Sequence, residues 1–216
     1  MTRNPDSPLP PPRSTYRHGD LRRALLDAGI DLARAGGPEA VVLREATRRA
    51  GVVPNAAYRH FGSRQALLQA VRAAALAALA AAMEAELARL RRRRPEAGYA
   101  RASLRAVGAA YLHFALNETG LFRTAFGRPL PAPDAAPADK AGPGGLNPFE
   151  LLGVALDRMV EAGVLSVARR PGAEYLAWSA VHGLALLLVD GPLYGMALAP
   201  VQALSKRVLD MVEQGL

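Results

Sequence analysis

The chain has 216 residues, half of them hydrophobic, and a formal net charge of +8. No apolar run reaches the roughly 18 or more residues that suggest a membrane span, and the polar N-terminus has no secretory signal. The lack of cysteine excludes disulfides and thiolate chemistry and fits a cytoplasmic protein. Residues 1–100 carry the whole net charge of +8 and residues 101–216 none, which favours a polyanion-binding head on a neutral body.

The N-terminal residues predict a tail followed by a helix. Residues 1–15 are rich in proline, so we expect a disordered tail. Arg13, Arg17 and His18 follow, either as a solvated arm or as an arm laid along DNA phosphates or into the minor groove. A first helix is expected from about residue 19 to 35, where Gly36-Gly37-Pro38 stops it.

Residues 42–68 are the most informative stretch. They predict a helix from Leu43 to Ala50, a turn at Gly51 where positive φ is needed, and a short helix from Pro54 to His60. Ser63 can cap a further helix that begins at Arg64. Two short helices around a glycine turn, with arginines nearby, are typical of a helix-turn-helix that reads a major groove.

The run Ala50-Gly51-Val52 followed by Tyr58-Arg59-His60-Phe61, Arg64 and Leu67-Leu68 resembles the DNA-binding domain of the TetR family of bacterial regulators, over about residues 17–72. The family usually has Lys where this chain has Arg64, and often Gly-Thr where Asn55-Ala56 stand. The second departure changes side chains that would face bases. The resemblance therefore implies DNA binding without implying the operator sequence.

Position in the short helix assigns roles to its residues. Val53, Pro54, Asn55 and Ala56 lie where base edges can be reached, and an amide such as that of Asn55 suits adenine. Asn55 is alternatively a local cap or turn residue. The resemblance implies phosphate contacts for Tyr58 and His60.

Basic residues around this helix supply further candidates. Arg64, at a helix N-terminus, and Arg44 are expected to clamp phosphates. Of Arg48, Arg49 and Arg59 we expect one to touch DNA, and Arg59 is included among the DNA-binding candidates. Phe61 is expected to close the core of the three-helix head.

The rest of the chain predicts helices and one long loop. An Ala-rich helix should run from Arg64 to about Arg93. Helices are expected at 100–117, 120–126, 148–162, 171–189 and 200–213, and a mobile loop rich in Pro and Gly at 127–147. No alternating pattern indicates a sheet. The predicted fold is all-α with about nine helices, divided into a head at 16–63 and a body at 64–216.

The body motif Trp178-x-x-x-His182-Gly183, with Asp190-Gly191 at a helix end, resembles the Trp-His-Gly branch of TetR-like C-terminal domains. That resemblance implies a homodimer whose last two long helices pair into a four-helix bundle, and a pocket for a small apolar or aromatic effector. Aromatic residues at helical spacing are either core or pocket, and His182, like His113, is a buried histidine or an effector ligand. The pocket candidates are Tyr111, Phe114, Phe122, Trp178 and His182.

Dimer pairing is expected through Ala177, Ala180, Val181, Leu184 and Leu188, with Val201, Leu204, Val208 and Val212 of the last helix. No catalytic, cofactor or metal-ligand motif is found, so we expect neither an enzyme nor a bound cofactor or metal. An enzyme would need His113 or His182 paired with Asp190 or Glu118.

The expected function is a dimeric repressor that binds a palindrome-like double-stranded DNA operator and is released by an effector. Helix 64–93 would transmit the signal from body to head. The alternatives are a sequence-indifferent architectural DNA-binding protein, or an all-α enzyme with a vestigial head.

Overall fold

The computed structural model describes residues 18–90, 96–128 and 134–216. The predicted tail 1–15, Arg13, Arg17 and the Arg91–Arg94 run lie outside the described residues, as do the side chains of His18, Pro54 and Ala56. All described regular structure is helical, which confirms the predicted fold class. The elements are α1 (His18–Ala40), α2 (Leu43–Arg49), α3 (Pro54–Tyr58), α4 (Arg64–Ala88), α5 (Glu96–Asn117), α6 (Thr119–Ala125), α7 (Pro148–Glu161), α8 (Ala173–Val189) and α9 (Leu198–Gly215), with 3-10 helices η1 (Pro137–Lys140) and η2 (Val167–Arg169).

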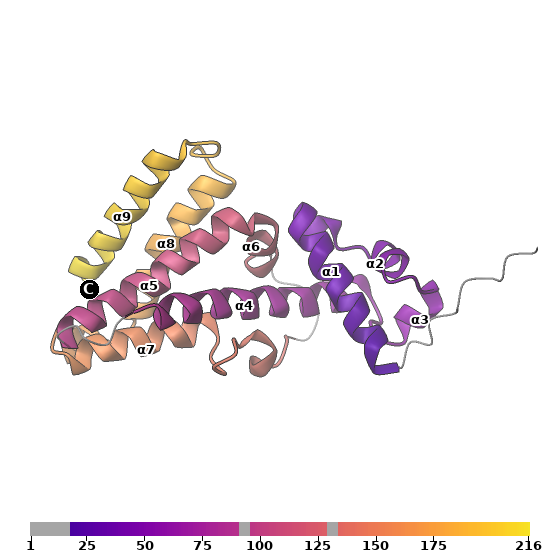
Figure 1. Ribbon diagram of the computed structural model, residues 1–216, viewed down its shortest axis with the longest axis horizontal. Coiled ribbons are helices and arrows are strands. Elements are labelled where there is room, and N and C mark those ends of the chain that lie inside the picture. Colours follow the sequence, from indigo (N-terminus) through magenta and orange to yellow (C-terminus); the bar gives the residue numbers. More distant parts are fainter. Residues whose placement is uncertain (1–17, 91–95, 129–133) are drawn as a thin grey trace, which may run out of the picture.

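Helices α1 to α3 form the head at one end of the molecule (Figure 1). Regular helix geometry in α1 breaks at Gly36 and Gly37, where Gly37 has φ of +70°, as the Gly-Gly-Pro sequence predicts. Gly51 between α2 and α3 has φ of +67°, which confirms the expected turn. Phe61 is 2% exposed in the core that also buries Leu25, Leu43 and Leu67, so its structural role is confirmed.

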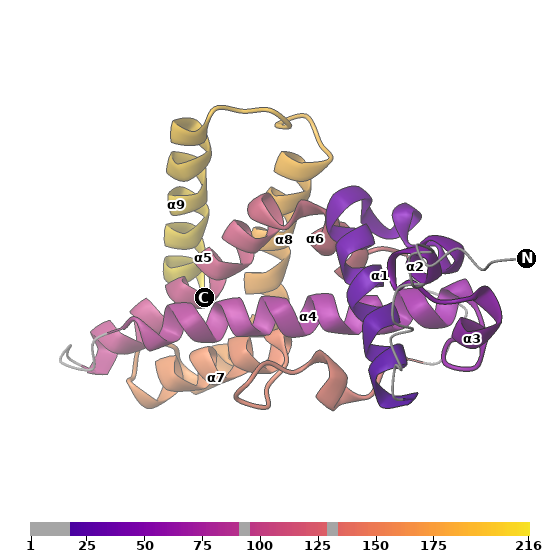
Figure 2. The same ribbon diagram turned by 45° about the vertical axis from the view of Figure 1, so that its right-hand side comes forward.

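Helix α4 runs from the head through the whole length of the body (Figure 2). The Ser63 hydroxyl accepts a hydrogen bond from the Ala66 N–H, which caps its start as predicted. The helix ends at Ala88 rather than near Arg93. Among the described helices, α4 alone is long and apolar enough to cross a membrane, judged by length and composition only. The mean hydropathy of its 18-residue apolar window is 1.7. Half of that apolar window is buried within the fold, and α4 packs against α1, α5, α6 and α7 as a core helix.

The segment expected to be a mobile loop is folded against α4 over residues 134–147, so this prediction is wrong for the described part. Gln69 on α4 donates to the Asp134 carboxylate at 2.7 Å, and the Gly144 N–H donates to the Glu84 carboxylate at 3.0 Å. Gly142 and Gly144 lie so close to Glu84 that a Cβ on either would come within 2.8 Å of its Oε1. Glycine at these two positions therefore permits the segment to lie close to α4, although a Pro- and Gly-rich composition alone predicts a loop.

The predicted dimer face is also wrong, because it lies on the buried side of α8. Ala177, Val181, Leu184 and Leu188 are buried inside the protomer, and so are Val201 and Val212 of α9. Ala180, Leu204 and Val208 are partly buried against the same core. The exposed side of α8 instead carries Leu176, Ser179, Gly183, Leu186 and Leu187, spaced at helical intervals.

Candidate DNA-binding face and ligand cavity

Val53 and Asn55 at the start of helix α3 and Tyr58 at its end face solvent. Val53 is 67% exposed and Tyr58 is 57% exposed, and Asn55 is also exposed. Ala57 is fully buried and anchors the helix on the head. Val53 directly before this five-residue helix and Tyr58 at its end are exposed in the described fold, which suits a surface that meets another molecule.

The arginines of the head divide into two groups. Arg48 donates to the Glu45 carboxylate at 2.9 and 2.7 Å, and Arg49 donates to it at 3.3 Å. The Arg48 hydrogen bonds are the main cause that lowers the pKa of Glu45 to about 2. Arg44 and Arg59 are exposed, and within the described residues neither has a hydrogen-bonded carboxylate. Arg59, rather than Arg48 or Arg49, therefore has its charge available for a phosphate. His60 lies beside it, half-buried.

Arg64 is placed differently from the expected phosphate clamp. Its Nε donates to the Val41 carbonyl and its Nη2 to the Pro38 carbonyl, both at 2.8 Å. The side chain thus closes the junction between α1 and α2. Two of the five N–H donors of Arg64 are therefore used inside the head, a structural role that the sequence did not predict, and its phosphate contact stays a prediction.

We expect Arg64→Ala to destabilise the protein by about 1–2 kcal/mol, since two charge-assisted hydrogen bonds to carbonyls are lost. Urea unfolding followed by circular dichroism measures this change. Arg59→Ala is the matched control and should leave stability unchanged. Unchanged stability of Arg64→Ala, together with weaker binding to every duplex, would show a phosphate clamp without the structural role.

The body encloses a cavity of about 370 Å³ between α4, α5, α7, α8 and α9. A volume of this size falls in the range of small-molecule sites and is far above an ordinary packing void. Its wall is mostly apolar, and the segment 134–147 contributes Lys140 and Asn147. The apolar lining includes Leu76, Met83, Leu104, Val107, Phe126, Leu152, Val181, Leu209 and Val212.

Three of the predicted pocket aromatics form one hydrogen-bonded group. The Tyr111 hydroxyl lies 2.6 Å from His182 Nδ1 and 3.2 Å from Trp178 Nε1. Burial lowers the pKa of His182 and raises that of Tyr111. A neutral His182 then accepts the hydrogen bond from the Tyr111 hydroxyl, while Trp178 donates to the phenol oxygen. Since its hydroxyl is occupied, Tyr111 presents mainly a ring to the cavity.

Of the five predicted pocket residues, Tyr111 and Trp178 line the cavity and the other three do not. Phe122 and His182 pack edge-to-face against Tyr111, with ring centroids 5.8 and 6.1 Å from its centroid. Phe114 is buried in the core. Phe126 and Phe149, which were not predicted as pocket residues, also line the cavity, at the ends of helices. Their turn-adjacent positions carry no helical periodicity that could have assigned them.

Helix α6 joins the cavity to the head. Ala125 at its end and the adjacent Phe126 line the cavity, while Gly120 near its start contacts the backbone of α1. A Cβ at Gly120 would lie 2.2 Å from the Ala33 carbonyl oxygen, so only glycine fits. Arg34 of α1 also pairs with Glu118 at 2.8 Å. The body therefore reaches the head through α6 as well as through α4.

A helix-turn-helix with an exposed short second helix, carried on an all-helical body with a ligand-sized cavity, defines a ligand-responsive DNA-binding regulator. Two family models match this chain: bacterial regulatory proteins of the tetR family over residues 25–71, and a tetracyclin repressor-like C-terminal domain over residues 104–212. The second alone spans about half of the sequence. The chain belongs to the TetR family of transcriptional regulators. The Trp-His-Gly branch stays a prediction.

Solved structures support this fold. A protein of unknown function from Rhodococcus sp. RHA1 is 28% identical, with a TM-score of 0.72 over 94% of this chain and 99% of that one. The stearoyl-CoA complex of the regulator FadR from Bacillus subtilis is 13% identical, with a TM-score of 0.61 over 90% and 98%. The regulator PfmR from Thermus thermophilus is 21% identical, with a TM-score of 0.51 over 89% and 98%. No curated protein matches the chain.

Proposed function

We propose that this protein is a cytoplasmic, homodimeric repressor that binds a palindrome-like operator and is released when a small apolar effector fills the body cavity. The observation that carries the proposal is the pairing, in one chain, of an exposed α3 with a largely apolar cavity. Helix α4 lines the cavity and packs against α1 of the head, and α6 gives a second route between body and head. The TetR-family membership supports the regulatory role.

DNA contact is proposed through α3 in the major groove. Val53 and Asn55 face solvent at the start of α3, where a helix-turn-helix places base-reading residues. Phosphate contacts come from Tyr58 at the end of α3, from Arg59 and His60 directly after it, and from Arg44 on α2. Pro54 and Ala56 stay predicted base-side residues.

Two substitutions separate base reading from phosphate binding. We expect Asn55→Ala to lower discrimination at one base pair of the operator by about 1–3 kcal/mol. Arg59→Ala should weaken binding to all duplexes alike and lower the slope of log affinity against log salt by about 1. The measurement is fluorescence anisotropy on a duplex selected by the wild-type protein from a random library, and on its single-site variants. A uniform loss for Asn55→Ala contradicts the base-reading role.

The proposed dimer uses the exposed stripe of α8, defined here as Leu176, Ser179, Gly183, Leu186 and Leu187. A Cβ at Gly183 would meet nothing within 4 Å, so the stripe has a shallow point where another helix can approach closely. Helix α9 adds Met211, which is 59% exposed. Two copies of such a stripe would pair through a two-fold axis and place two α3 helices about one DNA turn apart, roughly 34–36 Å, or a multiple of it.

Effector release follows from linkage. A ligand that fills the cavity presses on Leu76 and Met83 of α4 and on Phe126 beside α6. If the filled state holds the heads at a spacing that no longer fits DNA, DNA and ligand must weaken each other by the same factor. An architectural DNA-binding protein would show no such coupling. It would also be displaced by excess random duplex, whereas an operator-binding protein holds its site.

A further inference from the structure

We propose that the effector is an amphiphile with an apolar body and one anionic group, and that Arg105 binds this anion. The inference rests on the proposed function of the cavity and names the class of ligand that the cavity takes.

The charges of the cavity wall have one sign. Among the described residues that line it, Arg105 and Lys140 are charged, and none is Asp or Glu. The carboxylates that balance these cations lie outside the lining: Asp210 and Glu213 behind Arg105, and Asp134 behind Lys140. A molecule inside the cavity therefore meets a positive side chain before it meets a negative one. An apolar wall whose described charged residues are cations disfavours a cationic ligand and favours an anionic one.

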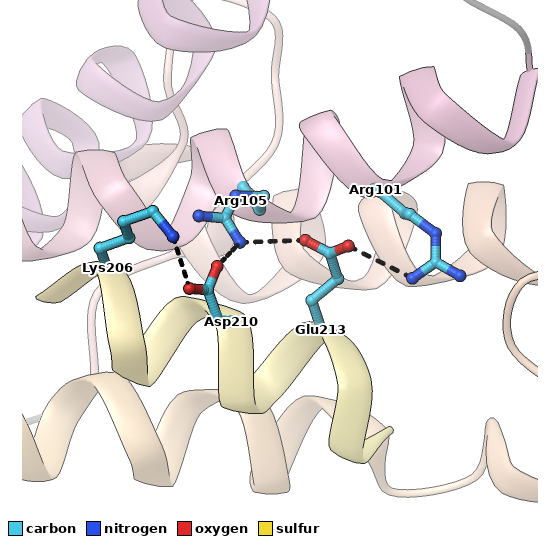
Figure 3. Close-up of polar contacts among 5 residues, drawn as sticks. All are labelled: Arg101, Arg105, Lys206, Asp210 and Glu213. Carbon is cyan, nitrogen blue, oxygen red and sulfur yellow. Dashed lines mark hydrogen bonds and ion pairs between the residues drawn. The ribbon is translucent and has the colours of Figure 1, made fainter.

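Arg105 has spare donors for an anion. Its Nη1 donates to Asp210 at 2.5 Å and to Glu213 at 3.0 Å, both on α9 (Figure 3). Within the described residues its Nε and Nη2 make no hydrogen bond. A guanidinium presents its N–H groups as a planar fork that fits a carboxylate or phosphate, and here only one corner of the fork is fully used.

Arg105 also lies where the cavity meets solvent. Arg105 and Leu209 line both the cavity and a second, open groove between α5 and α9. An anionic group held at Arg105 can thus keep part of its hydration while its apolar body fills the dry interior, which lowers the cost of burying the charge. Lys140 is the weaker candidate, because a lysine ammonium offers no fork and the groove does not reach it.

Binding of an anion at Arg105 would act on α9. Arg105 and Arg101 of α5 hold the C-terminal half of this helix through Asp210 and Glu213 (Figure 3). Leu209 of the same helix lies close to Gly108 of α5. A ligand anion competes with these two carboxylates for the same guanidinium. Ligand binding and the seating of α9 are therefore coupled through one side chain.

The test compares three probes with the same chain and different heads: decanoate, 1-decanol and decylamine. Trp178 lines the cavity and is the sole tryptophan of the chain, so its fluorescence reports occupancy directly. We expect wild-type protein at neutral pH to bind decanoate about tenfold more tightly than decanol, and decylamine most weakly. Equal binding of the three probes overturns the anionic class and leaves the proposed function standing. If no probe changes Trp178 fluorescence, the cavity is no effector site and the proposed function itself loses its support.

Four variants test Arg105 itself. Arg105→Gln should remove the preference for decanoate while decanol still binds, and Arg101→Gln, a cation of the same network that does not line the cavity, should keep the preference. Glu213→Gln should increase decanoate affinity, because a competing carboxylate is removed, and should leave decanol unchanged. This gain cannot arise from misfolding, so it also decides the case if Arg105→Gln fails to fold. Lys140→Gln should keep the preference. If Lys140→Gln abolishes it, or if Glu213→Gln gives no gain, the assignment to Arg105 is overturned.

Discussion

Gly120→Ala is expected to lower the free energy of unfolding by about 3 kcal/mol, near the upper end for overpacking in a core. An added Cβ would lie 2.2 Å from the Ala33 carbonyl oxygen and 2.5 Å from the Arg34 carbonyl oxygen of α1. Both atoms belong to helix backbone, so no side-chain rotation relieves the overlap. Either α6 must move away from the head, or the end of α1 must unwind. By thermal denaturation the midpoint should fall by roughly 6–12 °C.

The functional consequence follows from the place of Gly120 between cavity and head. Once α6 is pushed away from α1, filling the cavity should change DNA affinity less than in the wild-type protein, with decanoate as the probe ligand. Gly153→Ala is the matched control, a helical glycine of α7 whose added Cβ makes only ordinary contacts at 3.6 Å or more. It should be neutral or slightly stabilising. A Gly120→Ala protein with wild-type melting and full ligand response would show that α6 and α1 are not in tight contact.

The head could be predicted from the sequence because its signals are local. Gly51 at a positive-φ turn, Pro54 at the start of a helix and Ser63 as a cap each act within a few residues of chain. Arg64 shows the limit of this reasoning. An arginine at a helix start can clamp a phosphate, close a neighbouring turn or do both, and its hydrogen bonds to the distant carbonyls of Pro38 and Val41 have no local signal in the sequence.

The body was predicted less well because its decisive contacts are long-range. Helix α8 is apolar on nearly every side, so its periodicity identifies a helix without fixing which face points inward. The dimer face was consequently placed on the buried side. The composition of segment 134–147 predicts a loop. Its contact with α4 depends on Glu84 and Gln69, more than fifty residues earlier in the chain. The head-to-body contact at Gly120 has no local signal at all.

Leu187→Glu is expected to produce the largest loss of operator binding, about 100-fold or more. Leu187 is 43% exposed in the protomer, so a glutamate is tolerated in the isolated fold. In a two-fold dimer paired through the α8 stripe, the substitution would bury two carboxylates near the symmetry axis, where neither has a partner. The dimer would then dissociate, and operator binding would lose the gain that comes from joining two heads, which typically exceeds single-site affinity by about 10²–10⁴.

Analytical ultracentrifugation measures the oligomeric state of this variant, and anisotropy on the selected duplex measures its affinity. Val167→Glu is the matched control: the same gain of negative charge at a residue that is 76% exposed on η2 and lies off the stripe. The control should remain dimeric and bind as wild type. A Leu187→Glu protein that stays dimeric with full operator affinity would mean that the two copies meet elsewhere. Leu187→Ala separates lost packing from charge repulsion, because a small apolar residue should weaken the dimer without the repulsion that glutamate adds.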